Sequence, residues 1–376
     1  MRIGIDARWI FPKISGIGAY SRRLIENLAR IDKENQYFIF SNNPGLIEKY
    51  KLVSKPNFSL VEFSHSANSP VNQFLLPPQC QRLGLEVYHS PHFFTSTRLS
   101  SKLVVTIHDL IPLCFPHFTP RAKKVKFLRL FKYILQRVSR KADKIITISE
   151  HSKKDLVDAL QVREDKIEVI YNGVSSVYRP IPSESVRKRL GGVIPESSQV
   201  FLFVGRFDPY KNIVGLIKSF NDLKQEGDPE LKLVIVGEED TRYPEAPRLV
   251  KDLGLEKEVI LTGYLEEEEL VYWYNRAAAF ILPTFYEGFG LPIVEAFACG
   301  CPVITSNVAS VPEVAGDAAM LIEPGSQTAL TEAMRRILRD APFKENLRQK
   351  GLARAQLFSW EKTAKGVLEV YKRLAK

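Results

Sequence analysis

Cysteine is scarce in the 376-residue chain, and the four that occur do not form a metal-ligand pattern. They are too few for a disulfide framework, and Cys299-Gly-Cys301 is one residue short of a C-x-x-C motif. We therefore expect reduced, buried thiols, as is typical of a cytoplasmic protein. The cysteines are Cys80, Cys114, Cys299 and Cys301.

Long apolar runs are also missing. The longest, such as 200–204 and 277–282, fall far short of the ~20 residues that a membrane-spanning helix needs. The first six residues, Met-Arg-Ile-Gly-Ile-Asp, are typical of a strand and lack the long apolar segment of a secretory signal. Both absences favour a cytoplasmic location, with the inner face of a membrane as a further option.

Histidine is limited to six residues, none at helical or paired ligand spacing, and the chain has no convincing D-x-D motif. The run at 266–269 is four glutamates, which are typical of the solvated start of a helix. We therefore expect no metal site and no cofactor.

Positive charge is concentrated in the first half of the chain. Residues 1–180 contain 28 Lys and Arg against 15 Asp and Glu, whereas the whole chain has a net charge of +10. The first half thus suits an anionic partner, which could be a nucleic acid, an anionic lipid or a phosphorylated substrate.

Short β-rich runs alternate with helical stretches along the whole chain. Several of these runs are continuously apolar, as in parallel strands covered on both faces. The pattern predicts an α/β fold with two Rossmann-like, doubly wound parallel sheets. The expected strands are 2–6, 37–40, 60–63, 87–89, 103–108, 144–148, 167–170, 200–204, 232–236, 259–261, 280–282, 302–305 and 319–322.

Clustered proline, glycine and serine near 179–183 mark the best linker. We expect an N-terminal domain over 1–178, a second domain over 179–358, and a final segment over 359–376. That segment holds a helix near 360–374, which we expect to pack back on the first domain.

The most informative segment runs from Pro283 through Glu287-Gly-Phe-Gly290 into a helix. The glycines permit a backbone that turns amide groups outward, and a helix start favours negative charge. Glu287 and Glu295 could bind sugar or ribose hydroxyls there. The alternative is a strand–turn–helix corner in which Glu287 is a plain cap.

A second segment, Gly205-Arg206 to Lys211-Asn212, directly follows a predicted strand. In an open α/β sheet this is where ligands bind, and an Arg fork beside a Lys point charge suits a diphosphate. The alternative is a pair of solvated surface cations.

Two weaker signals lie in the first half. Gly16-Ile-Gly18 follows the first strand and could bring backbone amides to an anion, or could be a tight turn without a ligand. His108-Asp109 ends another strand, where the imidazole could hydrogen-bond a hydroxyl or could be a structural group.

The stretch 121–144 is rich in Lys and Arg, with Asp143 as its single acid. On a helix, Phe127, Phe131, Ile134 and Val138 share one face, and basic residues occupy the other. This pattern is typical of a helix on an anionic membrane, although a core-packed helix with a solvated face is the alternative. The basic residues are Lys126, Arg129, Arg137, Arg140 and Lys144.

Together these segments resemble glycosyltransferase family 4, the retaining nucleotide-sugar transferases of GT-B fold. The resemblance rests on Gly205-Arg206 with Lys211-Asn212 and on the E-x7-E pattern of Glu287 and Glu295. The opening residues 2–8, then Gly16-Ile-Gly18 and Ile107-His-Asp-Leu-Ile-Pro112, are most similar to the mannosyltransferase B-like branch, which includes O-antigen mannosyltransferases.

The resemblance implies two domains facing across a cleft and metal-independent transfer from a nucleotide diphosphate sugar. Arg206 and Lys211 would bind the diphosphate, Glu287 the sugar hydroxyls and Glu295 the ribose, while His108 would lie at the reacting face of the sugar. The other donor-binding positions that it implies are Gly16, Gly18, Gly205, Tyr264, Leu265, Gly288, Phe289, Gly290 and Leu291.

The branch favours GDP-mannose as donor and a glycan or lipid-linked glycan as acceptor. A UDP-sugar such as UDP-glucose is the alternative donor. A basic nucleic-acid-binding protein is the competing class, but the chain shows none of the usual nucleic-acid-binding modules.

Overall fold

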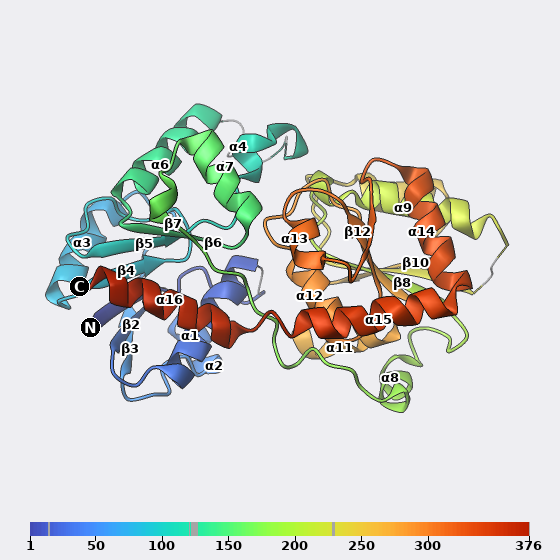
Figure 1. Ribbon diagram of the computed structural model, residues 1–376, viewed down its shortest axis with the longest axis horizontal. Helices are drawn as coiled ribbons and strands as arrows, with labels where there is room; N and C mark the ends of the chain where they lie inside the picture. Colours follow the sequence, from blue (N-terminus) through green and yellow to red (C-terminus); the bar gives the residue numbers. More distant parts are fainter. Residues whose placement is uncertain (14–15, 120, 122–126, 228–229, 376) are drawn as a thin grey trace. The chain divides into compact units, whose positions relative to one another are not determined.

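A parallel β-sheet forms the centre of each of two compact units in the computed structural model (Figure 1). The structure describes residues 1–13, 16–119, 121, 127–227 and 230–375. Unit 1 takes in the described residues of Met1–Pro116, Ala122–Gly173 and Ser359–Lys376. Unit 2 takes in those of His117–Arg121 and Val174–Phe358.

The seven-stranded sheet of unit 1 has the order β3-β2-β1-β4-β5-β6-β7, with every neighbouring pair parallel. The order reverses between β1 and β4, which is where ligands bind in doubly wound sheets. The strands are β1 (Arg2–Asp6), β2 (Gln36–Ser41), β3 (Phe58–Glu62), β4 (Val87–Ser90), β5 (Lys102–Thr106), β6 (Lys144–Thr147) and β7 (Ile167–Val169).

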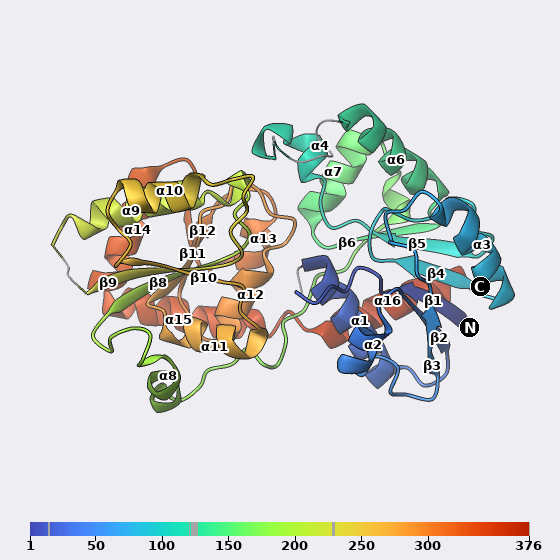
Figure 2. The same ribbon diagram turned by 180° about the vertical axis from the view of Figure 1, so that it is seen from behind.

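Helices cover both faces of this sheet (Figures 1 and 2). One face packs buried residues of α3, α6 and α7 against the strands, and α1 and α16 lie side by side on the other. The helices are α1 (Gly16–Ile31), α2 (Pro44–Lys49), α3 (Asn72–Arg82), α4 (Ile111–Cys114), α6 (Leu128–Lys141), α7 (Glu150–Leu160) and α16 (Trp360–Leu374), and η2 (Glu164–Lys166) is a 3-10 turn. A second 3-10 turn, η1 (Pro116–Phe118), has its first residue in unit 1 and the other two in unit 2.

The six-stranded sheet of unit 2 has the order β10-β9-β8-β11-β12-β13, and every neighbouring pair of strands is parallel. Its order reverses between β8 and β11. The strands are β8 (Gln199–Val204), β9 (Leu231–Val236), β10 (Val259–Gly263), β11 (Ala279–Leu282), β12 (Val303–Ser306) and β13 (Met320–Ile322).

In unit 2, α9 packs with α10 and α14, and α12 packs with α13 and α15. The helical segments of this unit are α8 (Ser183–Leu190), η3 (Pro209–Lys211), α9 (Ile213–Lys224), α10 (Glu245–Asp252), α11 (Glu267–Arg276), α12 (Leu291–Ala298), α13 (Val311–Ala315), α14 (Gln327–Arg339) and α15 (Ala341–Ala355).

The predicted doubly wound α/β fold is confirmed, because all thirteen expected strands form and pair in parallel. Their ends agree with the expected ones to within two residues. The continuous apolar run at 200–203 is fully buried, as expected for a strand with helices on both faces. In β5 the difference matters, because the strand ends at Thr106 and leaves His108 in the loop beyond it.

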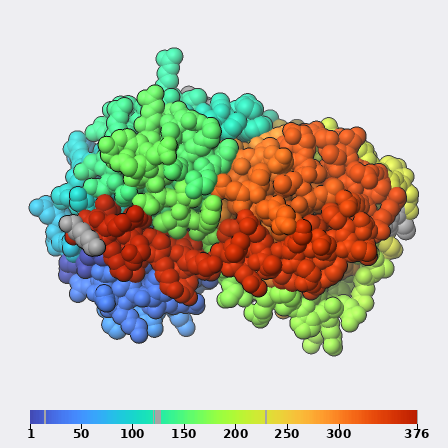
Figure 3. Space-filling model, viewed as in Figure 1, coloured from blue at the N-terminus to red at the C-terminus, as the bar shows by residue number. Residues whose placement is uncertain are grey.

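The last helix, α16, lies at the surface of unit 1, coloured red in Figure 3, and packs against α1. Its buried Tyr371 hydroxyl lies 2.5 Å from Nδ1 of His89 on β4. Nε2 of the same imidazole lies 2.8 Å from the Thr106 hydroxyl on β5. Burial lowers the pKa of His89 to about 3, so this imidazole is neutral at physiological pH.

Because His89 has a lowered pKa, its contribution makes the unit less stable as the pH falls. Below about pH 6.5 the imidazole of His89 is protonated in the unfolded chain but stays neutral in the folded chain. This difference lowers the free energy of unfolding by up to about 1.4 kcal/mol per pH unit. We expect urea unfolding of the wild type to lose about 2 kcal/mol more between pH 6.5 and 5 than unfolding of His89→Gln. Parallel pH profiles for the two proteins would contradict this assignment.

Candidate active site

Lys211 lies at the carboxyl end of β8, where η3 leads into α9. The next residue, Asn212, adopts the left-handed conformation with φ of 55° and caps α9 by accepting from the Gly215 amide at 3.2 Å. The Asn212 amide also donates to the Pro324 carbonyl at 2.7 Å, beyond β13. These contacts fix the backbone that carries Lys211.

Glu287 lies in the loop between β11 and α12, and this loop is fastened to the loop after β8. The Phe285 amide donates to the Tyr210 carbonyl at 2.7 Å, and the Ser310 hydroxyl donates to the Glu287 carbonyl at 2.8 Å. Gly290 caps α12 with φ of 91°, a conformation that favours glycine. The two loops therefore hold their side chains in a fixed relation.

Lys211 and Glu287 form an ion pair, with Nζ 2.5 Å from Oε1. The two side chains are only 11% and 9% exposed. The pair joins the carboxyl ends of β8 and β11, where the strand order of unit 2 reverses. The sequence predicted that both residues contact one ligand, but it held no signal that they would contact each other.

Arg206 follows β8 directly, and its side chain is two-thirds exposed. Its Nε lies 2.9 Å from a carboxylate oxygen of the buried Asp208. Asp208 is a site residue that was not predicted, although an Asp two residues from an Arg is a sequence signal for such a pair. The pair orients the guanidinium while leaving it accessible to an anion.

Gly205 and Gly237 show how closely the ends of β8 and β9 approach. A Cβ on Gly237 would lie 1.9 Å from the Gly205 carbonyl oxygen, so no side chain fits there. Gly237 also has φ of 152°. Glycine is therefore required at position 237 by the close approach of the two backbone segments beside Arg206.

The predicted donor-binding residues around α12 lie together in unit 2. Gly288, Phe289 and Gly290 are buried immediately before the helix, which starts at Leu291. Glu295 lies in the second turn of α12, where its Oε2 accepts from the Tyr274 hydroxyl of α11 at 3.0 Å. Burial and Glu295 both raise the pKa of Tyr274 well above its usual value.

Tyr264 and Leu265 follow β10 and are half-buried, and the Tyr264 hydroxyl donates to Glu266 at 3.3 Å. Gly205, Tyr264 and the α12 segment therefore all stand at carboxyl ends of strands in the same sheet.

Gly16 and Gly18 lie in unit 1, in the first turn of α1. The helix that follows β1 thus begins at Gly16 itself. Gly16 is exposed and Gly18 is buried. Amides of a first helical turn have no partner within the helix, so this turn can still meet an anion. Residues 14 and 15, which precede this turn, lie outside the described residues.

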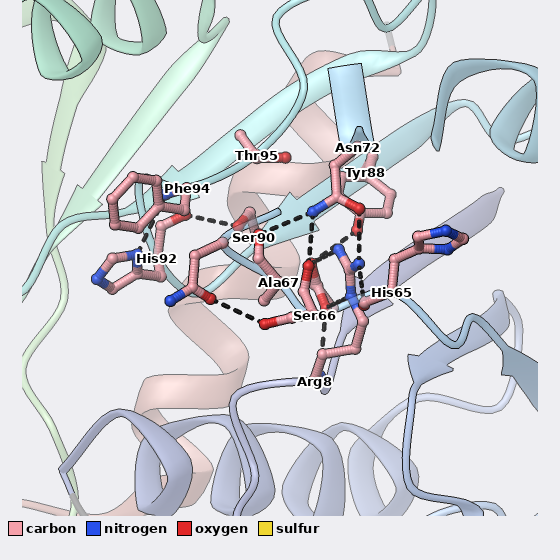
Figure 4. A network of polar contacts seen from close by, with 12 residues as sticks. Arg8, His65, Ser66, Ala67, Asn72, Tyr88, Ser90, His92, Phe94 and Thr95 are labelled. Atoms are coloured by element: carbon pink, nitrogen blue, oxygen red, sulfur yellow. Dashed lines mark hydrogen bonds and ion pairs between the residues drawn. The ribbon is translucent and has the colours of Figure 1, made fainter. Parts of the chain in front are cut away.

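Arg8 fastens the loop after β1 to the loop before α3, as Figure 4 shows. Its guanidinium forms a buried ion pair with Asp6 at 2.7 Å and donates to the His65 carbonyl at 3.0 Å and to Asn72 at 3.1 Å. Burial alone would lower the pKa of Arg8, but the Asp6 carboxylate more than offsets it and the pKa is raised. All of these contacts are internal, so Arg8 is structural.

His108 lies beyond β5 in unit 1 and is half-buried. Its Nε2 lies 3.0 Å from the Pro91 carbonyl, which can only accept, so Nε2 carries the proton and Nδ1 keeps the lone pair. Burial lowers the pKa of His108, although Asp109 and the Pro91 hydrogen bond act in the opposite direction. The imidazole is thus a neutral acceptor.

The helix predicted within 121–144 begins at Leu128, and the predicted apolar face is partly wrong. Phe131, Leu135 and Val138 pack into the core, but Phe127 is 66% exposed. Phe127 does not share the packed face because it precedes the first helical residue, whereas Ile134 packs against the core as predicted. Leu130 and Tyr133 are each 56% exposed.

The basic residues of this stretch do not all share the exposed face. Arg129, Arg137 and Arg140 are exposed, whereas Lys144 pairs with Glu168 on β7 at 3.0 Å and is half-buried. Lys144 thus differs from the exposed arginines, and its assignment to the membrane or acceptor surface stays a prediction. Lys126 lies outside the described residues.

Within the described residues, no cluster of three or more His, Cys, Asp and Glu side chains could hold a metal ion. No helix in that part of the chain has the length and apolar content to cross a membrane. The four cysteines are free thiols, and Cys114 is only half-buried, unlike the buried Cys80, Cys299 and Cys301.

Each half of the chain matches a family model of known glycosyltransferases. The Glycosyltransferase Family 4 model matches residues 14–176, and the model of Glycosyl transferases group 1 matches residues 187–354. O-antigen chain mannosyltransferase B of Escherichia coli is 30% identical over 378 residues, which cover 96% of this chain and 97% of the relative.

Solved GT-B structures share the fold at lower identity. Sucrose-phosphate synthase of Thermosynechococcus elongatus has a TM-score of 0.79 at 22% identity and covers 99% of this chain and 98% of its own. HepE of Anabaena, solved with UDP-glucose, has a TM-score of 0.77 at 19% identity and covers 99% and 100%. The chain therefore belongs to glycosyltransferase family 4, has the GT-B fold, and is a glycosyltransferase on the branch of the O-antigen mannosyltransferases.

Proposed function

We propose that the chain transfers mannose from GDP-mannose, without a metal ion and with retention of configuration, to a hydroxyl of a glycan or lipid-linked glycan. The observation that carries this proposal is the buried Lys211–Glu287 pair at the strand-order reversal of unit 2. It sets a cation and a carboxylate side by side, which is what a sugar joined to a diphosphate requires.

The pair can bind a donor without being broken. Lys211 has three N–H groups and gives one to Glu287, so two remain for phosphate oxygens. Glu287 uses Oε1 for Lys211, and its Oε2 can accept from a sugar hydroxyl. One contact between the two side chains therefore orients both halves of the donor.

Breaking the glycosyl–phosphate bond leaves a diphosphate with extra negative charge. In the proposed mechanism, Lys211, the exposed Arg206 guanidinium and the amides at the start of α12 stabilise this charge. These groups do what a metal ion does in other transferases. Front-face attack by the acceptor would retain configuration, and no side chain is proposed as a nucleophile.

The donor proposal rests on the relatives. A relative that matches nearly the whole chain is a mannosyltransferase, which favours GDP-mannose. HepE was solved with UDP-glucose, which keeps a UDP-sugar as the second candidate. In either case Glu295 on α12 is proposed to hold the ribose, and Tyr264 and Leu265 to contact the base.

A nucleotide-sugar panel tests the donor. A ligand that binds only the folded chain stabilises it by about 2.7 kcal/mol at 100 times its Kd. We expect GDP-mannose to raise the Tm more than UDP-glucose or ADP-glucose, with mannose 1-phosphate as the control that lacks a base. A larger shift with UDP-glucose would replace GDP-mannose by the second candidate.

A double-mutant cycle tests the site. Lys211→Met leaves the Glu287 carboxylate buried without its partner, so we expect unfolding to become easier by about 3 kcal/mol. Glu287→Gln should act similarly, whereas the double variant should lose less than the sum of the two. Turnover should fall at least about a hundredfold in all three. Additive urea-unfolding energies, or a Lys211→Met enzyme with normal turnover, would refute the assignment.

We further propose that α6 contacts the anionic inner face of a membrane, where a lipid-linked acceptor would lie, and that the enzyme is cytoplasmic. Exposed Phe127, Leu130 and Tyr133 provide apolar anchors, and exposed Arg129, Arg137 and Arg140 provide the charge. A helix that offers both kinds of side chain to solvent is typical of interfacial binding.

Vesicle sedimentation tests this contact. Each basic residue near an anionic surface adds about 1 kcal/mol, so the triple variant Arg129→Gln, Arg137→Gln, Arg140→Gln should bind phosphatidylserine vesicles at least about tenfold more weakly. The matched control removes three exposed charges from α8, at 187–189, and should bind like the wild type. Equal loss in both variants would indicate a net-charge effect and no specific surface.

A further inference from the structure

A chain of buried polar groups connects the C-terminal helix to the environment of His108. The Tyr371 hydroxyl of α16 contacts His89 Nδ1 at 2.5 Å, and His89 Nε2 contacts the Thr106 hydroxyl at 2.8 Å. The Thr106 hydroxyl lies 3.1 Å from the Tyr20 hydroxyl of α1. All four side chains have no exposed surface.

The end of this chain packs against His108. The Tyr20 ring meets the His108 ring edge to face, with centroids 4.9 Å apart and planes at 84°. On its other side, the imidazole of His108 donates to the Pro91 carbonyl, which follows β4 two residues after His89. The Tyr20 ring of α1 and the Pro91 carbonyl after β4 therefore both constrain the His108 ring.

The donor and acceptor roles of these linked polar groups are closely constrained. A neutral imidazole has one donor and one acceptor, so His89 must accept from one hydroxyl and donate to the other. Thr106 then accepts from one neighbour and donates to the next. Rotating any one group would leave a buried partner without a hydrogen bond, which is unfavourable. This row of hydrogen-bonded groups thus fixes the Tyr20 ring in one orientation.

Packing alone does not require these polar groups. Buried apolar residues of α16, among them Ala364, Val367 and Val370, already bury the helix on unit 1. A phenylalanine at 371 with an apolar partner at 89 would fill the same space without burying polar atoms. A buried network of polar side chains specifies one packing arrangement more than it adds stability. Here it specifies the arrangement of the side chains around His108.

We propose that Tyr371, His89, Thr106 and Tyr20 are positioning residues for the transfer reaction, holding the His108 imidazole through their continuous chain of contacts from α16. This inference rests on the proposed function, to which we add that Nδ1 of His108 accepts a hydrogen bond at the reacting face of the donor sugar, the place that the family resemblance implies for this residue. It makes the last helix of the chain part of the catalytic apparatus.

The direct test is the imidazole ¹⁵N NMR spectrum of the full-length protein, with the His108 signals assigned by their loss in His108→Gln. Thr106→Val and Tyr371→Phe each remove one hydroxyl of the chain. We expect both to shift the His108 signals and to raise the pKa of His108 toward its usual value, because a looser Tyr20 ring lets water reach the imidazole. Asp109 and His89, the charged and titratable neighbours that act on this imidazole, remain in both variants.

Turnover provides the second readout, measured as GDP release from GDP-mannose. We expect kcat to fall roughly tenfold to a hundredfold in Thr106→Val and Tyr371→Phe, because small misplacements of reacting groups have effects of this size. The KM for the donor should stay within about twofold, since the Lys211 and Glu287 contacts are unchanged. Thr106→Ser keeps the hydroxyl and should recover most of the lost turnover.

Tyr37→Phe is the matched control. Tyr37 is a fully buried tyrosine of the same unit. Its hydroxyl donates to Asp32 at 2.6 Å and not to any of the four linked polar residues. It should lower the Tm as Tyr371→Phe does, yet leave the His108 signals and kcat unchanged. If the two variants behave alike in NMR and in turnover, the proposed chain is only structural and the inference falls.

The variant His108→Gln distinguishes an error in the role of His108 from an error in the positioning inference alone. If it keeps full turnover, the role of His108 in the proposed function is wrong, and the positioning inference falls with it. If it loses turnover while Thr106→Val and Tyr371→Phe keep both their turnover and their His108 signals, the proposed function stands and only the positioning inference is overturned.

Discussion

The buried pairing of Lys211 with Glu287 is the constraint on which the architecture of unit 2 depends. A charge that is removed from water and left alone is strongly unfavourable, so the loops after β8 and β11 must keep the two groups together. The Asn212 cap and the Phe285–Tyr210 hydrogen bond serve that purpose. Because apolar residues of similar size would often be at least as stable, the pair is better explained by ligand binding than by folding.

Arg8 in unit 1 shows the opposite use of a buried charge. Its guanidinium is surrounded by Asp6, a carbonyl and an amide, so its hydrogen bonds are directed inward and it stabilises a loop. Arg206 is paired with one carboxylate and otherwise exposed. Both arginines follow a central strand and both lie two residues from an aspartate. Their difference in exposure, which sequence alone does not give, separates the structural cation from the candidate ligand-binding one.

Much of the fold could be predicted because apolar runs and their spacing depend on local sequence. The fully buried run at 200–203 is an example, since a strand covered on both faces needs no polar partner. The faces of α6 were predicted less well, because Phe127 satisfies the helical period but lies beyond the packed contacts of Phe131. Of the candidate site, residue types and strand ends could be predicted. The direct contact between Lys211 and Glu287 could not, because it joins positions 76 residues apart and leaves no local pattern.

The candidate residues of the two units lie in different electrostatic environments. In unit 2, Lys211 and Arg206 supply positive charge where a diphosphate would gain negative charge. In unit 1, burial lowers the pKa of His108 and keeps it neutral, and the groups behind it are hydroxyls and a neutral imidazole. A protonated histidine at the reacting face would repel an oxocarbenium-like sugar. A half-buried, uncharged acceptor avoids that repulsion, so the row of polar groups behind His108 is suited to the reaction because it carries no charge.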